Sequence, residues 1–196
     1  MRRGRVWWWA WALGGAMAIG VAWPARAVEP MAGGELTDAL RRFYGWVLAH
    51  PGKGLPTVRQ RAQLATLVTP SLSQLLKQAA DTEARCIRQA ERDEKPLLME
   101  GDLFVSHHEG ATEVDHGPVV QVDENHALAE MYLVSLDPRF PKAHPYRMTS
   151  WSDTVELQRE GGRWRVHNLR LEGQTLSASL RDYINAGEQI CTGTTP

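Results

Sequence analysis

The stretch TVELQREGGRWRVHNLRL, residues 154–171, decides the fold that we expect for this chain. Valine, leucine and tryptophan alternate with polar residues on both sides of Gly161 and Gly162. Alternation with a period of two is typical of strands with one buried face, and a two-glycine loop closes tight hairpins because glycine accepts positive φ. The stretch therefore predicts an antiparallel hairpin that lays one face on the core.

The two-residue loop also predicts which residues face each other across the hairpin. It pairs Glu160 with Arg163, and every other pair follows from the antiparallel geometry. The expected pairs are Arg159 with Trp164, Leu157 with Val166, Val155 with Asn168 and Asp153 with Arg170 on the core side, and Gln158 with Arg165 and Glu156 with His167 on the solvated side. Asp153 and His167 thus each have a structural partner, and a role in a pocket is the second interpretation of both.

Helical patterns precede this hairpin and one follows it. Strand-like runs occupy residues 119–122, 127–136, 147–158 and 163–171, and apolar residues recur at helical spacing within residues 35–50, 57–68, 69–94 and 175–187. The order indicates an α+β domain, because helices and strands are segregated along the chain. We expect N-terminal helices packed on a curved, mostly antiparallel four-stranded sheet, and a short C-terminal helix.

The first 27 residues have the layout of a secretory signal peptide. Three arginines precede an apolar run over residues 6–23, and Pro24 and the A-x-A triplet at 25–27 follow. We expect cleavage after Ala27 and a periplasmic or secreted protein; an uncleaved anchor and twin-arginine export are the alternatives. The remaining organisation would be a linker at 28–34, a single domain at 35–187 and a tail at 188–196.

The composition of the chain after residue 27 bounds its partners. Cleavage would remove four of the 22 basic residues and none of the 23 acidic ones, which leaves a net charge of −5. Nucleic-acid binding needs a basic patch that this part of the chain lacks, and it contains no further apolar run of membrane-spanning length. Its two cysteines, Cys86 and Cys191, predict a disulfide, because exported proteins pass through oxidising compartments.

Several segments resemble an exported bacterial domain family of unknown function, DUF 3828, of the nuclear transport factor 2-like superfamily. They are FYGWVL at 43–48, LVTPSLSQLL at 67–76, GDLF at 101–104, the hairpin at 154–171 and TLSASLRDYI at 175–184. The resemblance covers most of residues 35–187 and implies a cone, in which helices close over a curved antiparallel sheet. Superfamily members include isomerases and dehydratases and also non-catalytic binding modules. Asp102 matches the acidic turn of the family, although the proline expected after it is replaced by Leu103.

The segment VSHHEGATEVDH, residues 105–116, resembles a metal or catalytic site at first sight. His108 and Glu109 begin an H-E-x-x-H motif, but Thr112 stands where the second histidine is required. A site of His107, Glu109 and His116 is geometrically possible and matches no known ligand spacing. We therefore expect no metal and no cofactor, and interpret the segment as a polar connection at the rim of the sheet.

Seven residues are candidates for a pocket or its rim: Asp102, His107, Glu130, Tyr132, Trp151, Asp153 and His167. The chain has no nucleophile elbow, P-loop or dinucleotide fingerprint. We expect a non-catalytic domain of the cell envelope that binds a protein partner or a small ligand, for example as an immunity or inhibitor protein. Trp151 and Trp164 would belong to the core, or else line a pocket for an apolar ligand. The alternative function is a small enzyme of the isomerase, dehydratase or hydrolase type with an acid/base pair in the cavity.

Overall fold

The computed structural model describes residues 34–90 and 95–191, so the predicted signal peptide, most of the linker and the last five residues lie outside the described part. The elements are α1 (Glu35–Ala49), α2 (Val58–Leu64), α3 (Pro70–Gln89), β1 (Glu113–Gln121), β2 (His126–Leu136), the short 3-10 helix η1 (Pro145–Arg147), β3 (Met148–Glu160), β4 (Arg163–Leu171), β5 (Gln174–Thr175) and α4 (Leu176–Ile190). Across these residues, none of the helices combines the length and the apolarity that a membrane crossing requires.

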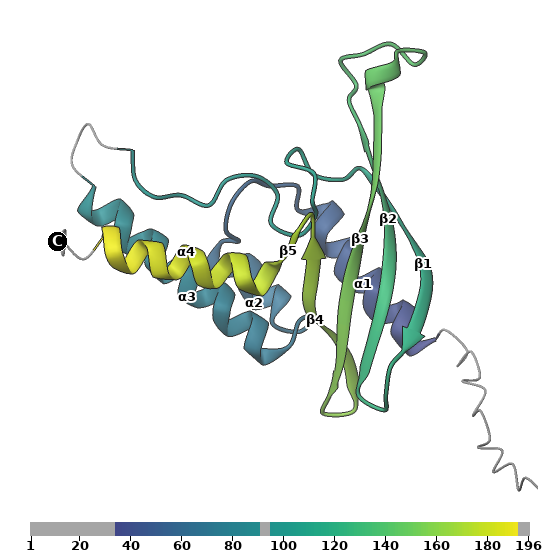
Figure 1. The fold of residues 1–196 in the computed structure, drawn as a ribbon, viewed down its shortest axis with the longest axis horizontal. Helices are drawn as coiled ribbons and strands as arrows, with labels where there is room; N and C mark the ends of the chain where they lie inside the picture. Colours follow the sequence, from purple (N-terminus) through teal and green to yellow (C-terminus); the bar gives the residue numbers. More distant parts are fainter. Residues whose placement is uncertain (1–33, 91–94, 192–196) are drawn as a thin grey trace, which may run out of the picture. The chain divides into compact units, whose positions relative to one another are not determined.

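The strands form one open antiparallel sheet in the order β1-β2-β3-β4-β5 (Figure 1). The α+β class and the antiparallel sheet are as predicted. The count of four strands was one short, because the turn after β4 adds the two-residue β5 before α4 begins. The cone that the resemblance implies stays a prediction.

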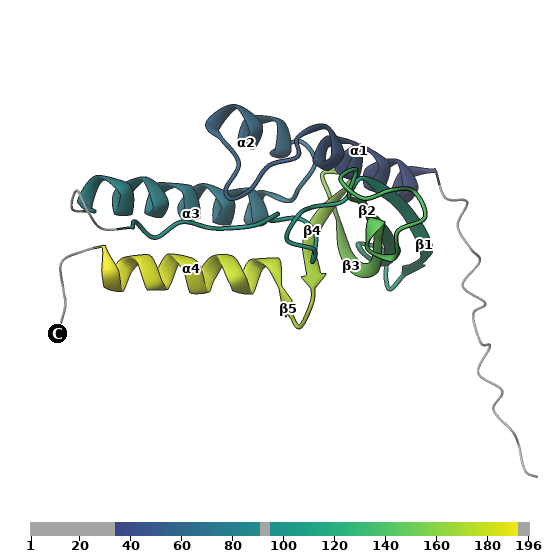
Figure 2. The same ribbon diagram turned by 90° about the horizontal axis from the view of Figure 1, so that it is seen from above.

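α1 lies across one face of the sheet, whereas α3 and α4 run side by side away from it (Figure 2). α1 contacts β4 and β1, whereas α3 packs mainly on α4. The apolar side of α1 consists of Ala39, Leu40, Phe43, Tyr44 and Val47, all buried. Thr69 caps α3 and Pro70 follows as its first residue, as the sequence indicates.

The hairpin register agrees with the prediction from the loop as far as Leu157 and Val166. Beyond that pair β4 contains a β-bulge at His167, so Glu156 faces Asn168 and Val155 faces Leu169. The predicted pairs of Val155 with Asn168, Glu156 with His167 and Asp153 with Arg170 are therefore wrong. In the corrected register Arg170 faces Thr154, and its Nε donates to Glu156 Oε1 at 2.6 Å diagonally across the hairpin. Asn168 Oδ1 accepts from the Ser177 N–H at the start of α4.

A disulfide and a segment that is hydrogen-bonded to both helices hold α3 against α4. Cys86 near the end of α3 is disulfide-bonded to Cys191, the residue that caps α4. Because α4 ends at Ile190, it extends into the region 188–196 that we predicted as a tail. Between the helices, Tyr183 donates to the Leu97 carbonyl at 3.0 Å and Glu83 accepts from the Met99 N–H at 3.1 Å. The segment after α3 is thus bound to both helices.

Gly187 lies where α4 approaches α3 closely. A Cβ atom at this position would lie 2.1 Å from Thr82 Cγ2. We expect Gly187→Ala to lower the free energy of unfolding by about 1–3 kcal/mol, because the helices must separate. Gly45→Ala in α1 is the matched control, since nothing lies within 4 Å of its Cβ position; it should raise stability by roughly 0.5–1 kcal/mol. Urea unfolding of both variants measures this, and equal changes would contradict the close approach.

Candidate functional site

Asp153 is the centre of a buried polar cluster at the loop before β1. It is 3% exposed, and its Oδ2 accepts from the Ser106 N–H at 3.0 Å and from Trp151 Nε1 at 3.1 Å. Its Oδ1 accepts from the Ser106 hydroxyl. The Ser106 Oγ in turn accepts from the Glu172 N–H at 2.9 Å. The carboxylate is fully engaged, so its direct effect is to anchor the loop to β3.

His107 joins the same cluster through Trp151. The two rings stack with centroids 5.0 Å apart, and His107 Nδ1 is buried without a hydrogen-bond partner among the described residues. The ring also borders a groove of about 430 Å³ beside the connection between β2 and β3, which Arg139 and Tyr146 line as well. The structure therefore brings together His107, Trp151 and Asp153 of the predicted site residues.

Tyr44 lies close enough to Asp153 and Asp102 for both charges to act on its hydroxyl. Burial, followed by the charges of Asp153 and Asp102, holds the pKa of the Tyr44 hydroxyl well above its ordinary value, and among the described residues this hydroxyl has no hydrogen-bond partner. Asp102 Oδ1 accepts from the Phe104 N–H at 2.8 Å. Tyr44 lines a cavity of about 280 Å³ between α1 and β1, Asp102 lines another of about 190 Å³, and Asp153 lines neither. Neither of these two cavities is lined by more than one of the three groups.

The half-buried carboxyl group of Asp102 predicts a pH effect on stability. Burial raises its pKa above 3.8, while the hydrogen bond from Phe104 opposes the shift. Between the ordinary and the raised pKa the folded chain holds a proton that the unfolded chain has released, so this group makes stability fall as pH rises. Asp102→Asn should remove this contribution to the fall of stability with rising pH.

Urea unfolding at a series of pH values measures this difference. From about pH 3 to about pH 6, the free energy of unfolding of Asp102→Asn should rise relative to the unmodified chain. Asp182→Asn, exposed on α4, is the control for removing a surface carboxylate. A constant difference between the Asp102 variant and the unmodified chain would contradict the burial of this group.

The other predicted site residues lie elsewhere. Glu130 and Tyr132 are both exposed on the sheet face opposite the core, where the Tyr132 hydroxyl donates to Glu130 Oε2 at 3.2 Å. Glu130 and Tyr132 therefore lie apart from the Asp153 cluster. His167 sits in the bulge with its Nδ1 3.4 Å from Thr69 Oγ1. Within the part of the chain that the structure describes, no three metal-binding side chains converge.

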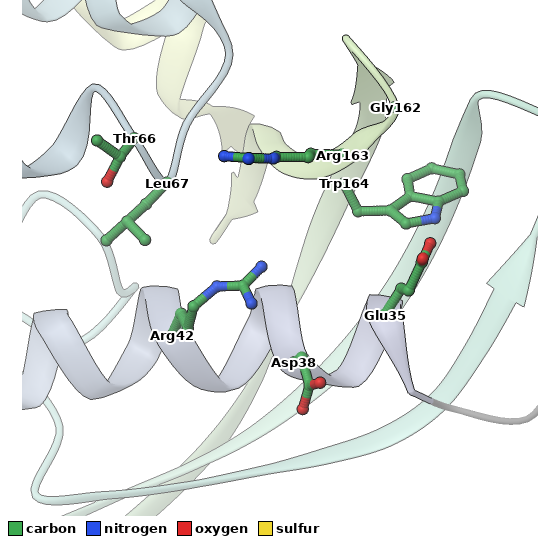
Figure 3. A pocket seen from close by; sticks show the side chains of 8 residues that line it. All are labelled: Glu35, Asp38, Arg42, Thr66, Leu67, Gly162, Arg163 and Trp164. Atoms are coloured by element: carbon green, nitrogen blue, oxygen red, sulfur yellow. The ribbon is translucent and has the colours of Figure 1, made fainter.

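A cavity of about 460 Å³ opens between α1, the end of α2 and the β3–β4 turn (Figure 3). Its lining residues are Glu35, Asp38, Arg42, Thr66, Leu67, Gly162, Arg163 and Trp164. Figure 3 shows the guanidinium groups of Arg42 and Arg163 pointing into the same space from opposite elements. Of these residues, only Trp164 was expected from the sequence to line a pocket, as the alternative to a place in the core.

The two acidic side chains of this cavity are already paired. Glu35 Oε2 lies 2.7 Å from Arg159 Nη2, and Asp38 Oδ1 lies 2.7 Å from Arg41 Nη1. The Arg159 guanidinium is further fixed by its position 5.5 Å from the ring centroid of Trp164. The carboxylates of Glu35 and Asp38 are therefore neutralised by Arg159 and Arg41, which do not line the cavity.

The two cationic side chains that face the cavity are unpaired. Among residues 34–90 and 95–191, neither Arg42 nor Arg163 has an ion-pair partner. Trp164 is only 6% exposed, so its indole forms part of a firm wall. The cavity thus offers two free guanidinium groups beside an apolar surface. Sequence signals for it were weak: Arg42 follows Glu35 and Asp38 at helical spacing on α1, and Arg163 adjoins the Gly-Gly turn.

Comparisons with known proteins assign no family. No protein-family model and no curated protein matches the chain. Among solved structures, the phospholipid-binding protein from Ralstonia solanacearum in complex with a phospholipid is similar at 12% identity, over 79% of this chain and 71% of that one, with a TM-score of 0.29. At this TM-score the similarity assigns neither fold nor ligand here. Membership of DUF 3828 stays a prediction.

Proposed function

We propose that this chain is an exported, non-catalytic binding domain of the cell envelope that holds a small anionic ligand between Arg42 and Arg163. The observation that carries the proposal is the pair of unpartnered guanidinium groups on one cavity. A guanidinium presents a planar fork of donors that matches carboxylate, phosphate or sulfate oxygens. Because Glu35 and Asp38 are paired elsewhere, an entering anion meets uncompensated positive charge.

The cavity also indicates the size of the ligand and the polarity of its remaining part. Its volume of about 460 Å³ lies within the range of small-molecule sites. Leu67 and Trp164 line it with apolar surface, while the anionic end would lie between the arginines. A carboxylate or phosphate ester with a compact apolar part fits this arrangement better than the purely apolar ligand that the tryptophans alone suggested.

Two further observations support the finer parts of the proposal. The disulfide between Cys86 and Cys191 fits an oxidising compartment, and the pattern of residues 1–27 fits export. N-terminal sequencing of the exported chain should then begin at Val28.

A partner protein that inserts an aspartate or glutamate into the cavity is the second candidate, because the guanidinium groups of Arg42 and Arg163 would bind its carboxylate. An immunity or inhibitor protein belongs to this case.

Substitution of the arginines tests the ligand site. The chain from Val28, which contains every described helix and strand, is titrated calorimetrically with inorganic phosphate, sulfate, and small carboxylates and phosphate esters. At least one of these anions should bind saturably. Arg42→Ala and Arg163→Ala should each weaken its binding about tenfold or more, in line with roughly 1.5–3 kcal/mol for a hydrogen bond to a charged group.

Arg181→Ala is the matched control, because Arg181 is exposed on α4 away from the cavity. It should bind as the unmodified chain does. An affinity that stays unchanged in Arg42→Ala and Arg163→Ala, or that falls equally in Arg181→Ala, would contradict the proposal.

A further inference from the structure

The connection between β2 and β3, residues 137–148, forms a projecting hairpin tip (Figure 1). Arg139, Lys142 and Arg147 carry three positive charges there and Asp137 one negative charge, so the tip has a net charge of +2. The whole chain has a net charge of −1, so the remainder is at −3. A basic pole on an otherwise acidic chain orients the molecule toward negative surfaces.

The hairpin tip is fixed in shape by aromatic packing and backbone bonds. The rings of Phe140 and His144 stack with centroids 4.5 Å apart, and Tyr146 contacts both rings. The Asp137 N–H donates to the Arg147 carbonyl at 2.8 Å, and the Arg147 guanidinium donates to the Phe140 carbonyl. The tip is therefore preorganised, and binding need not order it.

Apolar side chains are exposed on the same tip. Tyr146 is 74% exposed and Met148 60% exposed. Arg139, beside them, has 82% of its side chain exposed, and Lys142 is also exposed. Exposed aromatic groups interleaved with long cationic side chains suit the boundary between lipid headgroups and acyl chains, where the rings partition and the cations reach phosphates.

We propose that the hairpin tip docks on an anionic lipid surface. A protein partner is the weaker fit, because a stable protein interface takes roughly 20–30 residues a side, and this tip has twelve, on a projecting convex loop. A lipid surface needs no complementary pocket and accepts a small convex insertion. Tyr146 and Met148 would enter the headgroup region, and Lys142, which has no ion pair within the described residues, would contact a lipid phosphate. Arg139 is ion-paired with Asp137 at 2.6 Å and would reach a phosphate only by exchanging that partner. The proposal is independent of the cavity in Figure 3.

Vesicle co-sedimentation of the chain from Val28 tests the proposal. The chain should bind vesicles of equal parts phosphatidylglycerol and phosphatidylcholine, and bind pure phosphatidylcholine at least tenfold more weakly. Lys142→Glu and Tyr146→Ser should each reduce binding to the anionic vesicles at least fivefold. Lys142 has no ion pair within the described residues, so Lys142→Glu should keep the near-ultraviolet circular dichroism of the unmodified chain. Tyr146→Ser removes one ring from the cluster with Phe140 and His144, so its fold is checked by far-ultraviolet circular dichroism, which should be unchanged.

Arg181→Glu on α4 makes the same charge change outside the tip and should alter binding less than twofold. Arg163→Ala should also bind vesicles normally, which separates this site from the anion cavity. Absence of binding to phosphatidylglycerol vesicles, as a tip specific for an acidic protein would show, overturns the proposal. Binding that Lys142→Glu and Tyr146→Ser leave unchanged overturns it as well.

Discussion

Replacement of Asp153 by alanine should lower the free energy of unfolding by about 4 kcal/mol, because it removes a buried carboxylate that accepts three hydrogen bonds. The Ser106 N–H and the Trp151 Nε1–H, both on half-buried residues, would lose their partner. The loop that carries Phe104 and Val105 into the core would lose its anchor to β3. Chemical denaturation with fluorescence detection measures the change.

The controls distinguish a buried acceptor from a lost charge. Asp182→Ala, exposed on α4, should change stability by less than about 0.5 kcal/mol. Asp153→Asn keeps one oxygen as acceptor and should fall between the two. If Asp153→Ala were as stable as Asp182→Ala, the anchoring of the loop by Asp153 would be refuted.

Loss of the disulfide should have an effect of similar size. The bond between Cys86 and Cys191 closes a loop over a sequence separation of 105 residues. In the chain-entropy model such a link is worth about 4 kcal/mol, which corresponds to a fall in Tm of roughly 10 °C for a domain of this size. Cys86→Ala, followed by thermal unfolding, measures the loss.

The pattern of single and double variants tests the bond itself. Cys86→Ala, Cys191→Ala and the double variant should lose nearly the same stability, because each breaks the same link. Intact mass of the unmodified chain should rise by two hydrogens on reduction. Additive losses in the double variant, or a mass insensitive to reductant, would show that the cysteines act separately.

The sequence predicted the hairpin correctly only where local rules apply. The Gly-Gly loop fixes the register from Glu160 and Arg163 to Leu157 and Val166. Alternation contains no sign of the bulge at His167, because one extra residue in β4 leaves the local pattern of polar and apolar residues plausible. The shift beyond the bulge removed Arg170 from Asp153, and the true partner of Asp153, Ser106, comes from a loop 47 residues earlier.

The alternation of residues along β2 shows which side chains share a face, but not which of the two faces is buried. Glu130 and Tyr132 share a face of β2, but the buried face is formed by Ala127, Ala129 and Met131. Periodicity shows which residues lie together, and the position of α1 decides which face is covered. That position is tertiary, so the meeting of Arg42 on α1 with Arg163 on β4 could not be predicted from either segment alone.

The anion site is tested most directly by the NMR signals of the arginine Nε–H groups during titration of the chain from Val28 with inorganic phosphate. The signals of Arg42 and Arg163 should shift together, saturate and give one Kd, while that of Arg181 stays in place, because only the first two face the cavity. Assignment by Arg42→Lys and Arg163→Lys identifies the signals. Shifts that grow in proportion across all arginines, or no shift at Arg42 and Arg163, would contradict an anion site between them.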